Sequence, residues 1–515
     1  MFSRYKTDIK VYVLVETIKI NHKVGVSHSV TSKFAFYYKN TNKILSKKRK
    51  KSPPLLNIKM EAYAAEGKSI ARLEGGKVLF VDNAIPGDII DVGVTKDKKS
   101  WAEGRMIRLV TPSPERIEPF CQHFGICGGC KWQMLPYPQQ LIYKQQQVSD
   151  QLQRIGHVAL PEISPIIGSP HERYYRNKLE FTFSTQRYRT FEEISERDEK
   201  FVPEPALGFH APGLFHKVVE IHTCYLQHEP VNLLINTLRE YTKAHNLPYY
   251  DFKAQYGWLR NVIIRTTTTG ETLVNLVMHH EDKEAREGIL QHILENVPGI
   301  TSLNYTLNGK MNDTIYDQEV ICWYGKNYIE EKLERFRFKI SPKSFFQTNT
   351  YQAEALYRVT REFAGLTGVE TLYDLYCGTG SIGIFCSGSA GKVIGIEAVE
   401  DAIKDAYENA ALNELSNCLF FAGDVEKICT DTFFATHGRP DVIITDPPRA
   451  GMTEKLIRQL LKIRAPKVVY VSCNPATQAR DLQLLDEAYK ITRLQPVDMF
   501  PHTHHIENAA LLELR

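Results

Sequence analysis

The last third of the chain alternates between strand-like and helix-like segments, and this alternation restricts the possible folds more than any other feature. Strand-like runs occupy 371–375, 393–396, 419–422 and 442–445, and a helix-like pattern covers 400–412. Strands that alternate with helices form parallel sheets covered by helices on both faces. We therefore predict an α/β fold, a doubly wound Rossmann-like sheet, for residues 336–515.

The ends of these predicted strands carry residues suited to a nucleotide-like ligand. Tyr376-Cys377-Gly378-Thr379-Gly380 follows the first strand, and glycines there let a ligand approach the backbone. Glu397 ends the second strand, where an acid can accept both ribose hydroxyls. Asp424 follows the third strand, where it could receive an adenine amino group. A lone G-x-G turn is weak evidence, and the missing Walker lysine disfavours a triphosphate.

A further strand-like run ends in a cysteine. Val468–Val471 leads into Ser472-Cys473-Asn474-Pro475, and Asn-Pro cannot continue a strand. Because chemistry in open α/β sheets takes place at the carboxyl ends of strands, the Cys473 thiol could serve there as nucleophile and leaving group. The alternative is a small packing residue, since free cysteine is often buried. The run alone favours packing, whereas the neighbouring motifs favour catalysis.

Three other cysteines are close in sequence. Cys121, Cys127 and Cys130 flank Gly128-Gly129, whose flexibility lets the backbone wrap around a bound group. Zinc would need a fourth ligand from a nearby CxxC or His pair, and this region offers none. A [4Fe–4S] cluster also takes four thiolates, and the fourth can be remote. We predict a metal site with Cys224 as the fourth ligand, and an iron–sulfur cluster in preference to zinc.

Two domains are predicted ahead of the α/β domain. Residues 51–112 contain short strand-like runs between turns, as in a small β-barrel that binds RNA or serves as a docking module. Residues 113–335 hold the cysteines and a mixed α and β pattern. Within them, Tyr174–Phe181 places aromatic and basic residues together. This stretch could bind unpaired RNA, or it could be an ordinary half-buried strand.

Charge is uneven along the chain. The net charge is +4, but residues 1–60 hold 14 Lys or Arg against two acids, which leaves the remainder at −8. Whole-chain charge therefore gives no support for nucleic-acid binding. We expect residues 1–50 to be a basic, disordered leader. No run of 18 apolar residues occurs, so we predict no membrane span. We also expect a cytoplasmic location and a monomer.

Several motifs together resemble the RNA (uracil-5)-methyltransferase family. They are Phe345-Phe346-Gln347-Thr348-Asn349, Asp374–Gly380, Asp446-Pro447-Pro448-Arg449, Ser472-Cys473-Asn474-Pro475, and Met499–Thr503 followed by His505-Ile506-Glu507. Glu66–Arg72, with Val81 and Pro86-Gly87-Asp88, resembles the TRAM domain, an RNA-binding barrel. The barrel and the cysteines are similar to the iron–sulfur branch of this family, whose best-known members modify 23S ribosomal RNA.

The resemblance implies a covalent mechanism with S-adenosylmethionine as the methyl donor and RNA as the partner. Cys473 would add to C6 of uracil, and Glu507 would remove the proton from C5. The residues expected to contact the cofactor are Gln347, Tyr376, Glu397 and Asp446, to which we add Asp424. The residues expected to hold the [4Fe–4S] cluster are Cys121, Cys127, Cys130 and Cys224. The target uridine would be single-stranded or flipped, because stacking hides its edge.

Alternatives remain open on the sequence. RNA cytosine-5 methyltransferases use similar covalent chemistry but typically place a Pro-Cys after the fourth strand, where this chain has Pro447-Pro448-Arg449. A transfer-RNA target has no clear discriminator. A non-catalytic RNA-binding or assembly factor would not need Cys473 and Glu507. Considered by spacing alone, Glu507 fits a surface acid, and the histidines at 502, 504 and 505 fit a polar supporting loop better than a metal site.

Overall fold

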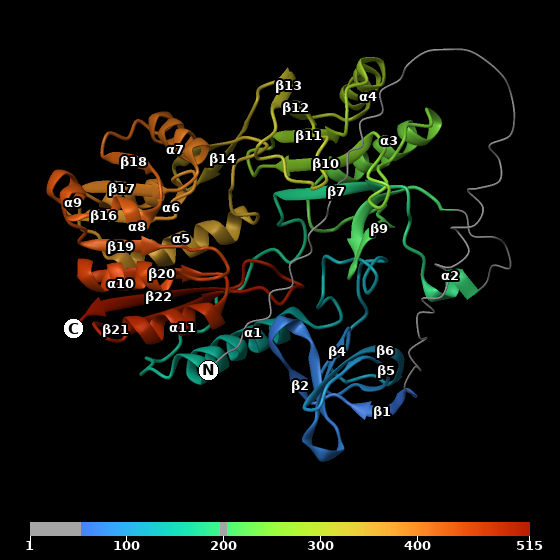
Figure 1. Ribbon diagram of the computed structural model, residues 1–515, viewed down its shortest axis with the longest axis horizontal. Helices are drawn as coiled ribbons and strands as arrows, with labels where there is room; N and C mark the ends of the chain where they lie inside the picture. The colour runs from blue at the N-terminus through green and yellow to red at the C-terminus, as the bar shows by residue number, and fades with distance from the viewer. Residues whose placement is uncertain (1–52, 196–202) are drawn as a thin grey trace, which may run out of the picture. The chain divides into compact units, whose positions relative to one another are not determined.

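Within the described residues, 53–195 and 203–515, three large sheets follow one another along the chain (Figure 1). This computed structural model places residues 54–515 in one compact unit. The predicted leader at 1–50 lies outside the described residues.

The first sheet has six strands in the order β1-β5-β6-β4-β3-β2. They are β1 (Leu55–Lys59), β2 (Ala62–Tyr63), β3 (Ser69–Arg72), β4 (Val78–Asp82), β5 (Ile89–Asp97) and β6 (Trp101–Thr111), with single turns η1 (Ala65–Gly67) and η2 (Glu74–Gly76). Side chains alternate along β4, so Leu79 and Val81 enter a small apolar core with Ile90 and Val92. The short strands predicted between 69 and 109 are confirmed, with β5 and β6 longer than expected.

The second, central sheet has seven strands in the order β13-β12-β11-β10-β7-β8-β9, and only β11 and β12 pair in parallel. They are β7 (Lys178–Ser184), β8 (Ala206–Ala211), β9 (Leu214–Glu220), β10 (Leu259–Thr266), β11 (Thr272–Met278), β12 (Ile300–Leu307) and β13 (Val320–Gly325). The helices are α2 (Phe191–Ser195), α3 (Val231–Ala244) and α4 (Lys283–Asn296). Leu234 of α3 and Ile289 of α4 belong to one apolar core with Phe181 and Val262, so these helices cover one face of the sheet.

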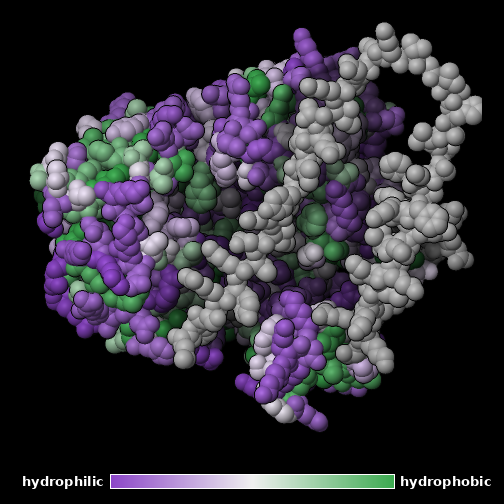
Figure 2. Space-filling model, in the orientation of Figure 1, coloured by the Kyte–Doolittle hydropathy of each residue, from purple (hydrophilic) through white to green (hydrophobic). Residues whose placement is uncertain are grey.

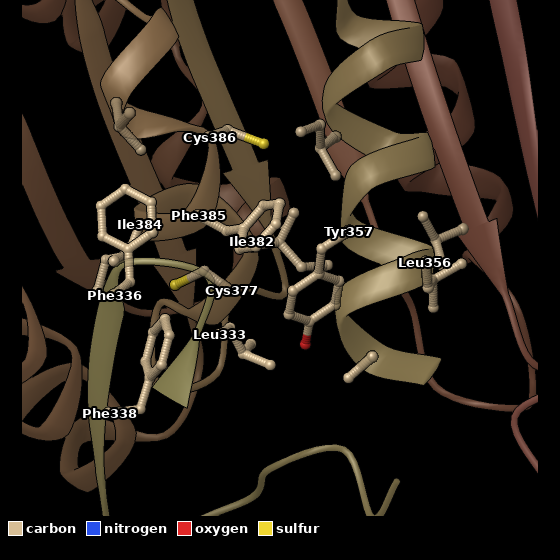
Figure 3. Packing of buried hydrophobic residues seen from close by; sticks show 14 of the residues in the cluster. Leu333, Phe336, Phe338, Leu356, Tyr357, Cys377, Ile382, Ile384, Phe385 and Cys386 are labelled. Carbon is tan, nitrogen blue, oxygen red and sulfur yellow. The ribbon is translucent and has the colours of Figure 1, made fainter. Parts of the chain in front are cut away.

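A hairpin leads from the central sheet to the third sheet. β14 (Ile329–Leu333) pairs antiparallel with β15 (Phe336–Ile340). Phe336 of this hairpin lies 6.2 Å from Phe385 between ring centres, and Phe338 belongs to the same buried cluster (Figure 3). The hairpin therefore packs with the third sheet and positions the segment around Gln347 that follows it.

The third sheet has seven strands in the order β18-β17-β16-β19-β20-β22-β21. They are β16 (Thr371–Leu375), β17 (Lys392–Glu397), β18 (Cys418–Ala422), β19 (Val442–Thr445), β20 (Lys467–Ser472), β21 (Tyr489–Val497) and β22 (Glu507–Leu514). Strands β16 to β20 are parallel, whereas β22 runs antiparallel between β20 and β21. The predicted doubly wound sheet is confirmed, and the antiparallel pair at one edge is an addition that the local pattern did not indicate.

Helices cover both faces of this third sheet (Figure 1). One face packs on α5 (Thr350–Ala364), α6 (Ser381–Cys386) with the turn η4 (Ser387–Ser389), and α7 (Glu400–Leu412). The other packs on α8 (Val425–Ile428), α9 (Asp431–His437), α10 (Glu454–Ile463), α11 (Pro475–Leu485), and α1 (Tyr137–Gln151) with its continuation η3 (Leu152–Gly156). Val469 faces the first group while Val468 and Tyr470 face the second, which is why β20 is apolar throughout.

The surface in the view of Figure 2 is largely hydrophilic, with hydrophobic patches between the polar residues. Among the described residues, no helix combines the length and the apolar character needed to cross a membrane.

Candidate active site

Cys473 and Glu507 meet because of the register between their strands. Cys473 directly follows β20, and Glu507 is the first residue of β22. These strands are antiparallel with Ser472 opposite Asn508. The next opposed pair is therefore Cys473 and Glu507, at the point where the ladder ends. The register thus brings the two predicted catalytic residues to one place.

Burial dominates the electrostatics around these residues. Burial and then the charges of Glu507 and Asp446 raise the pKa of Cys473 to about 12, against a lowering effect of Arg449. Burial also raises the pKa of Asp446 to about 7 and that of Glu507 well above its ordinary value, and the Asp446 charge adds to the effect on Glu507. The site therefore keeps the thiol protonated at neutral pH and places carboxyl groups beside it that can exchange protons.

The turn after β16 and the end of β17 form the expected cofactor side. The Glu397 carboxylate accepts the N–H of Gly378 at 3.2 Å on one oxygen and that of Val399 at 3.0 Å on the other. Gly378 and Gly380 have φ values of 53° and 78°, which glycine adopts without steric penalty. Tyr376 also has positive φ, 63°, and lines the cavity. The turn can thus bring its backbone close to a ligand.

The two other predicted cofactor residues differ in their placement. Gln347 lines the cavity, and its backbone carbonyl accepts a hydrogen bond from Asn177 Nδ2 at 2.9 Å. Asp424 caps α8 by accepting the Glu426 N–H at 3.0 Å. Asp424 is not among the described residues that form the cavity wall, so its contact with an adenine edge stays a prediction.

One cavity of about 1720 Å³ joins the predicted site residues other than Asp424. Its wall includes Gln347, Tyr376, Glu397, Asp446, Arg449, Cys473 and Glu507. It extends past Phe500 and His505 to the four cysteines, and it also reaches the central sheet at Lys178 and Glu180. Pockets for one small ligand usually measure about 300–1,000 Å³, so this cavity has room for a cofactor and part of a larger substrate.

The four predicted metal ligands lie at one end of this cavity. Burial raises the pKa of Cys127 to about 11 and those of Cys130 and Cys224 to about 12, and their mutual charges contribute. Cys121 lines the same wall. As a donor set, four thiols suit an iron–sulfur cluster. However, no three His, Cys, Asp or Glu side chains of the described residues are arranged to hold a metal ion, so the geometry does not show a metal centre.

The loop before Glu507 is held by a buried ion pair with α1. Lys144 Nζ lies 2.6 Å from Asp498 Oδ1, and both side chains are fully buried. Tyr137 donates to the other Asp498 oxygen at 2.8 Å. Lys144 also donates to the Phe500 carbonyl at 3.0 Å. Because neither charge reaches water, this pair fixes where the loop begins.

His502 anchors the middle of the same loop. Its backbone N–H donates to Gln140 Oε1 at 2.8 Å. Its carbonyl accepts the N–H groups of Lys131 at 2.7 Å and Trp132 at 3.0 Å. The Trp132 indole donates to the Gly67 carbonyl of the first sheet region at 3.2 Å. The residues that follow Cys130 therefore tie the first sheet region to the loop that carries Glu507, which agrees with the predicted supporting role of the histidine loop.

Sequence reasoning missed some aromatic residues of the cavity. Phe209 of β8 lines the cavity and stacks on Phe181 with ring centres 4.5 Å apart. Its strand is short and begins after a charged insert, so no clear alternation singled it out. By contrast, the stretch Tyr174–Phe181 was indicated as an RNA-binding candidate. Its Arg176 lies 5.6 Å from the centre of the Phe500 ring and lines the cavity.

Comparison with known proteins agrees with this geometry. Residues 137–515 match the family described as tRNA (uracil-5-)-methyltransferase, and residues 56–107 match the TRAM domain. The chain belongs to this uracil-5 methyltransferase family. An uncharacterized RNA methyltransferase of Bacteroides thetaiotaomicron is 52% identical over 455 residues, covering 88% of this chain and 100% of that relative. A second, from Porphyromonas gingivalis, is 51% identical and covers 87% of this chain and 98% of its own.

A solved structure gives the same result. The tRNA (uracil-54, C5)-methyltransferase of Pyrococcus abyssi, in complex with S-adenosyl-L-homocysteine, is 28% identical with a TM-score of 0.69. The match covers 89% of this chain and 100% of that one. The predicted S-adenosylmethionine-dependent RNA methyltransferase fold with a TRAM domain is therefore confirmed for this uracil-5 methyltransferase. Neither the iron–sulfur branch nor the choice of ribosomal RNA follows from these matches.

Proposed function

We propose that this protein transfers a methyl group from S-adenosylmethionine to C5 of a uridine in 23S ribosomal RNA, with Cys473 as the covalent nucleophile and Glu507 as the base. The observation that carries the proposal is the strand register that opposes Cys473 and Glu507 in the wall of the large cavity. A thiol and a carboxylate on adjoining strand ends can act on neighbouring atoms of one base.

The chemistry accounts for both residues. C5 of uracil is a weak nucleophile, so the Cys473 sulfur first adds to C6 and the electron pair of the C5–C6 bond moves onto the C4 carbonyl as an enolate. The enolate electrons return through C5, which attacks the methyl group of S-adenosylmethionine. The bond from that methyl carbon to the sulfonium sulfur breaks, and S-adenosylhomocysteine leaves. Glu507 accepts the C5 proton, the C–H electron pair re-forms the C5–C6 double bond, and the sulfur leaves. The Cys473 sulfur leaves as a thiolate and can react again in the next turnover.

The protonation states impose one further step. Since the pKa of Cys473 is raised to about 12, its proton must leave before or during addition to C6. Asp446, with its pKa raised to about 7, can hold such a proton near neutral pH. Arg449 lowers the pKa of Cys473 and so favours the thiolate. We assign Asp446 to accept this proton and Arg449 to stabilise the charge.

The cofactor supplies the electrophilic methyl group. Glu397 would accept its ribose hydroxyls, because two backbone amides already orient the carboxylate. Tyr376, Gln347 and Asp446 would line the rest of its site, and Asp424 is proposed for the adenine edge.

We further propose that Cys121, Cys127, Cys130 and Cys224 hold a [4Fe–4S] cluster. Support comes from four thiol donors in one wall of the cavity and from glycines at 128 and 129. Iron and sulfide analysis with Mössbauer spectroscopy of anaerobically prepared protein tests this without reference to activity. Cys224→Ala is expected to lose the spectrum. A wild-type protein without iron would contradict the assignment.

The target RNA has two candidates. The resemblance of the cysteine set to the iron–sulfur branch favours ribosomal RNA, whereas the TRAM match favours an RNA substrate of either class. The match to the Pyrococcus abyssi enzyme, whose name gives uracil-54 of tRNA as its target, supports transfer RNA. In either case we expect the uridine to be unpaired or flipped, because the reaction needs both C5 and C6 exposed.

A methyl-transfer assay tests the proposal. Labelled S-adenosylmethionine, unmodified 23S ribosomal RNA or tRNA transcripts, and the purified protein are expected to give labelled 5-methyluridine with one RNA class. Cys473→Ala is expected to abolish the label, whereas Cys322→Ala, which removes an exposed thiol on β13, should leave it unchanged. Label in 5-methylcytidine, or full activity of Cys473→Ala, would contradict the mechanism. The absence of label from both RNAs would favour a non-catalytic RNA-binding factor.

A further inference from the structure

The central sheet has one apolar face and one polar face. Its apolar face packs on α3 and α4. On the opposite face, the register aligns Lys178 with Arg265 and Thr182 with Asn261. Glu180 lies opposite Ile263 of β10, and Ile263 lies opposite Asn275 of β11. Asn275 in turn lies opposite Asn304 of β12, so these residues form one row across the sheet. Directly opposed residues share a face, so charged and amide side chains gather on this side.

Several of these buried side chains have unused hydrogen-bonding atoms. Asn261 donates to Glu180 at 3.1 Å, but its Oδ1 has no protein partner. Arg265 donates to the Ser344 carbonyl through Nη2, while its Nε has none. Asn275 Nδ2 and Asn304 Oδ1 are likewise unpaired. Buried polar atoms almost always find partners, and each one left unpaired costs about 1–3 kcal/mol. Four such atoms lie on one sheet face, and their residues are not among the described residues of the cavity wall. They mark the buried part of this face as polar, beside the part that opens into the cavity.

This face opens into the large cavity on the side of the central sheet. Lys178, Glu180 and His210 line the cavity there. The segment between β12 and β13 lies over the face, because Ile315 packs on Ile263 and Val277. The residue after Ile315 is Tyr316, which also lines the cavity. We call this part of the cavity, lined by Lys178, Glu180, His210, Tyr316 and Phe345, the central wing.

The central wing combines exposed rings with charged groups. Tyr316 and Phe345 are 64% and 65% exposed, although both line the cavity. Aromatic rings left open in this way stack on nucleic-acid bases. Lys178 offers a positive charge and Glu180 a carboxylate, and amide and carboxylate groups hydrogen-bond to base edges. An inorganic anion would be repelled by Glu180, and an apolar ligand would leave both charges unpaired.

We propose that the central wing binds a second unpaired nucleotide of the substrate RNA, next to the uridine that is methylated, and that it prefers a base with an exocyclic amino group. This rests on the proposed function, which supplies the RNA. Tyr316 stacks on the base, Glu180 accepts from its amino group, and Lys178 donates to a ring nitrogen or phosphate. Asn261 holds the Glu180 carboxylate in place by donating to it. Uracil has no exocyclic amino group and offers Glu180 only its ring N3–H, which is one donor hydrogen fewer than an amino group supplies.

The first test measures binding separately from methylation. The affinity of fluorescent 23S ribosomal RNA and tRNA transcripts is measured by anisotropy without S-adenosylmethionine. Tyr316→Ala is expected to weaken binding roughly tenfold, as the loss of one stacked base does. Tyr256→Ala is the matched control, because Tyr256 is 70% exposed on the same domain and is not among the described residues of the cavity wall. Equal affinity of Tyr316→Ala and wild type, or no RNA binding at all, would overturn the proposal.

The second test measures base preference. Transcripts with each of the four bases at the nucleotides flanking the target are compared by KM and kcat, or by affinity if neither RNA is methylated. Wild type is expected to prefer amino-bearing bases about tenfold at one position. Glu180→Gln, which keeps the shape of the side chain, should reduce that preference, with the change appearing mainly in KM for the amino-bearing transcripts. The same preference in Glu180→Gln and wild type would overturn the assignment. Failure of methylation alone would count against the proposed function and not against this site.

Discussion

The third sheet and the central sheet each have seven strands, but they present their functional residues differently. In the third sheet, Tyr376, Asp446 and Cys473 each follow a strand, so they meet at one edge. In the central sheet, Lys178 and Glu180 lie along one strand and face the cavity. Strand ends concentrate a few reacting groups at a point, whereas a sheet face spreads contacts over a surface. Changes at the ends should therefore alter the chemical rate, and changes on the face should alter RNA affinity.

The largest effect is expected for Glu507→Gln. The amide keeps the shape of the side chain but cannot accept the C5 proton, so kcat should fall by about 10²–10⁴ with little change in RNA affinity. The methylated covalent intermediate should accumulate as a protein–RNA band on a denaturing gel. Glu513→Gln, at the far end of the same strand, is the control. If Glu507→Gln weakened RNA affinity and left kcat unchanged, the rule that strand-end residues set the rate and sheet-face residues set the affinity would be wrong.

A smaller effect, on stability, is expected for Lys144→Met. It leaves the Asp498 charge buried without its partner, which typically costs about 3–5 kcal/mol. The free energy of unfolding from denaturant titration measures this loss, and kcat should fall because the loop carries Glu507. Lys404→Met removes an exposed pair with Asp401 and should change stability by less than about 1 kcal/mol.

The double variant Lys144→Met/Asp498→Asn sharpens this test. It removes both buried charges and should regain part of the lost stability. If Lys144→Met lowers RNA affinity and leaves kcat intact, α1 supports binding and not the position of the catalytic loop.

The smallest effect is a pH dependence due to Asp374. Burial raises the pKa of this carboxyl from 3.8 to about 7, although it accepts the Gly383 N–H at 2.8 Å. The folded state therefore binds more protons than the unfolded state between these values, so stability should fall as pH rises from 5 to 8. The expected loss from this group is about 2–3 kcal/mol, from 1.36 kcal/mol per unit.

Asp374→Asn should remove the part of the slope that Asp374 contributes, whereas Asp446 and Glu507, whose pKa values are also raised by burial, keep their parts. Melting temperatures at pH 5 and pH 8 measure it, and Asp431→Asn, at an exposed position, is the control. An unchanged slope would mean that the buried carboxyl does not keep its proton. The third sheet would then hold a buried negative charge below the edge that binds the ligand, just as the central sheet holds charged side chains on its polar face.

Local elements of the third sheet were predictable from the sequence. β16 and β19 and helix α7 have the predicted limits, because runs of apolar residues there end at glycine, proline or acidic residues. α1 was missed because its residues are mostly polar, including six glutamines, and give only a weak apolar stripe. The predicted domain limits 51–112, 113–335 and 336–515, the cytoplasmic location and the monomeric state stay predictions.

Long-range pairing was not predictable. The motifs identified Cys473 and Glu507 separately, but only the insertion of β22 between β20 and β21 explains why they meet. The contacts of Lys144 and Gln140 with the loop before Glu507 join residues more than 350 positions apart. A local sequence pattern does not indicate contact partners that are so distant in the chain. The polar face of the central sheet was hidden for the same reason, since it follows from register across four strands.

The hydrogen bonds from Lys131 and Trp132 to the His502 carbonyl have a consequence for folding. They close a loop of several hundred residues, and the entropy that such closure costs is regained only after the sheets between have formed. The segment that carries Glu507 should therefore become ordered last. A partly folded chain would hold Cys473 at the end of its strand without the base that completes turnover, so it could capture a uridine but would release the product slowly.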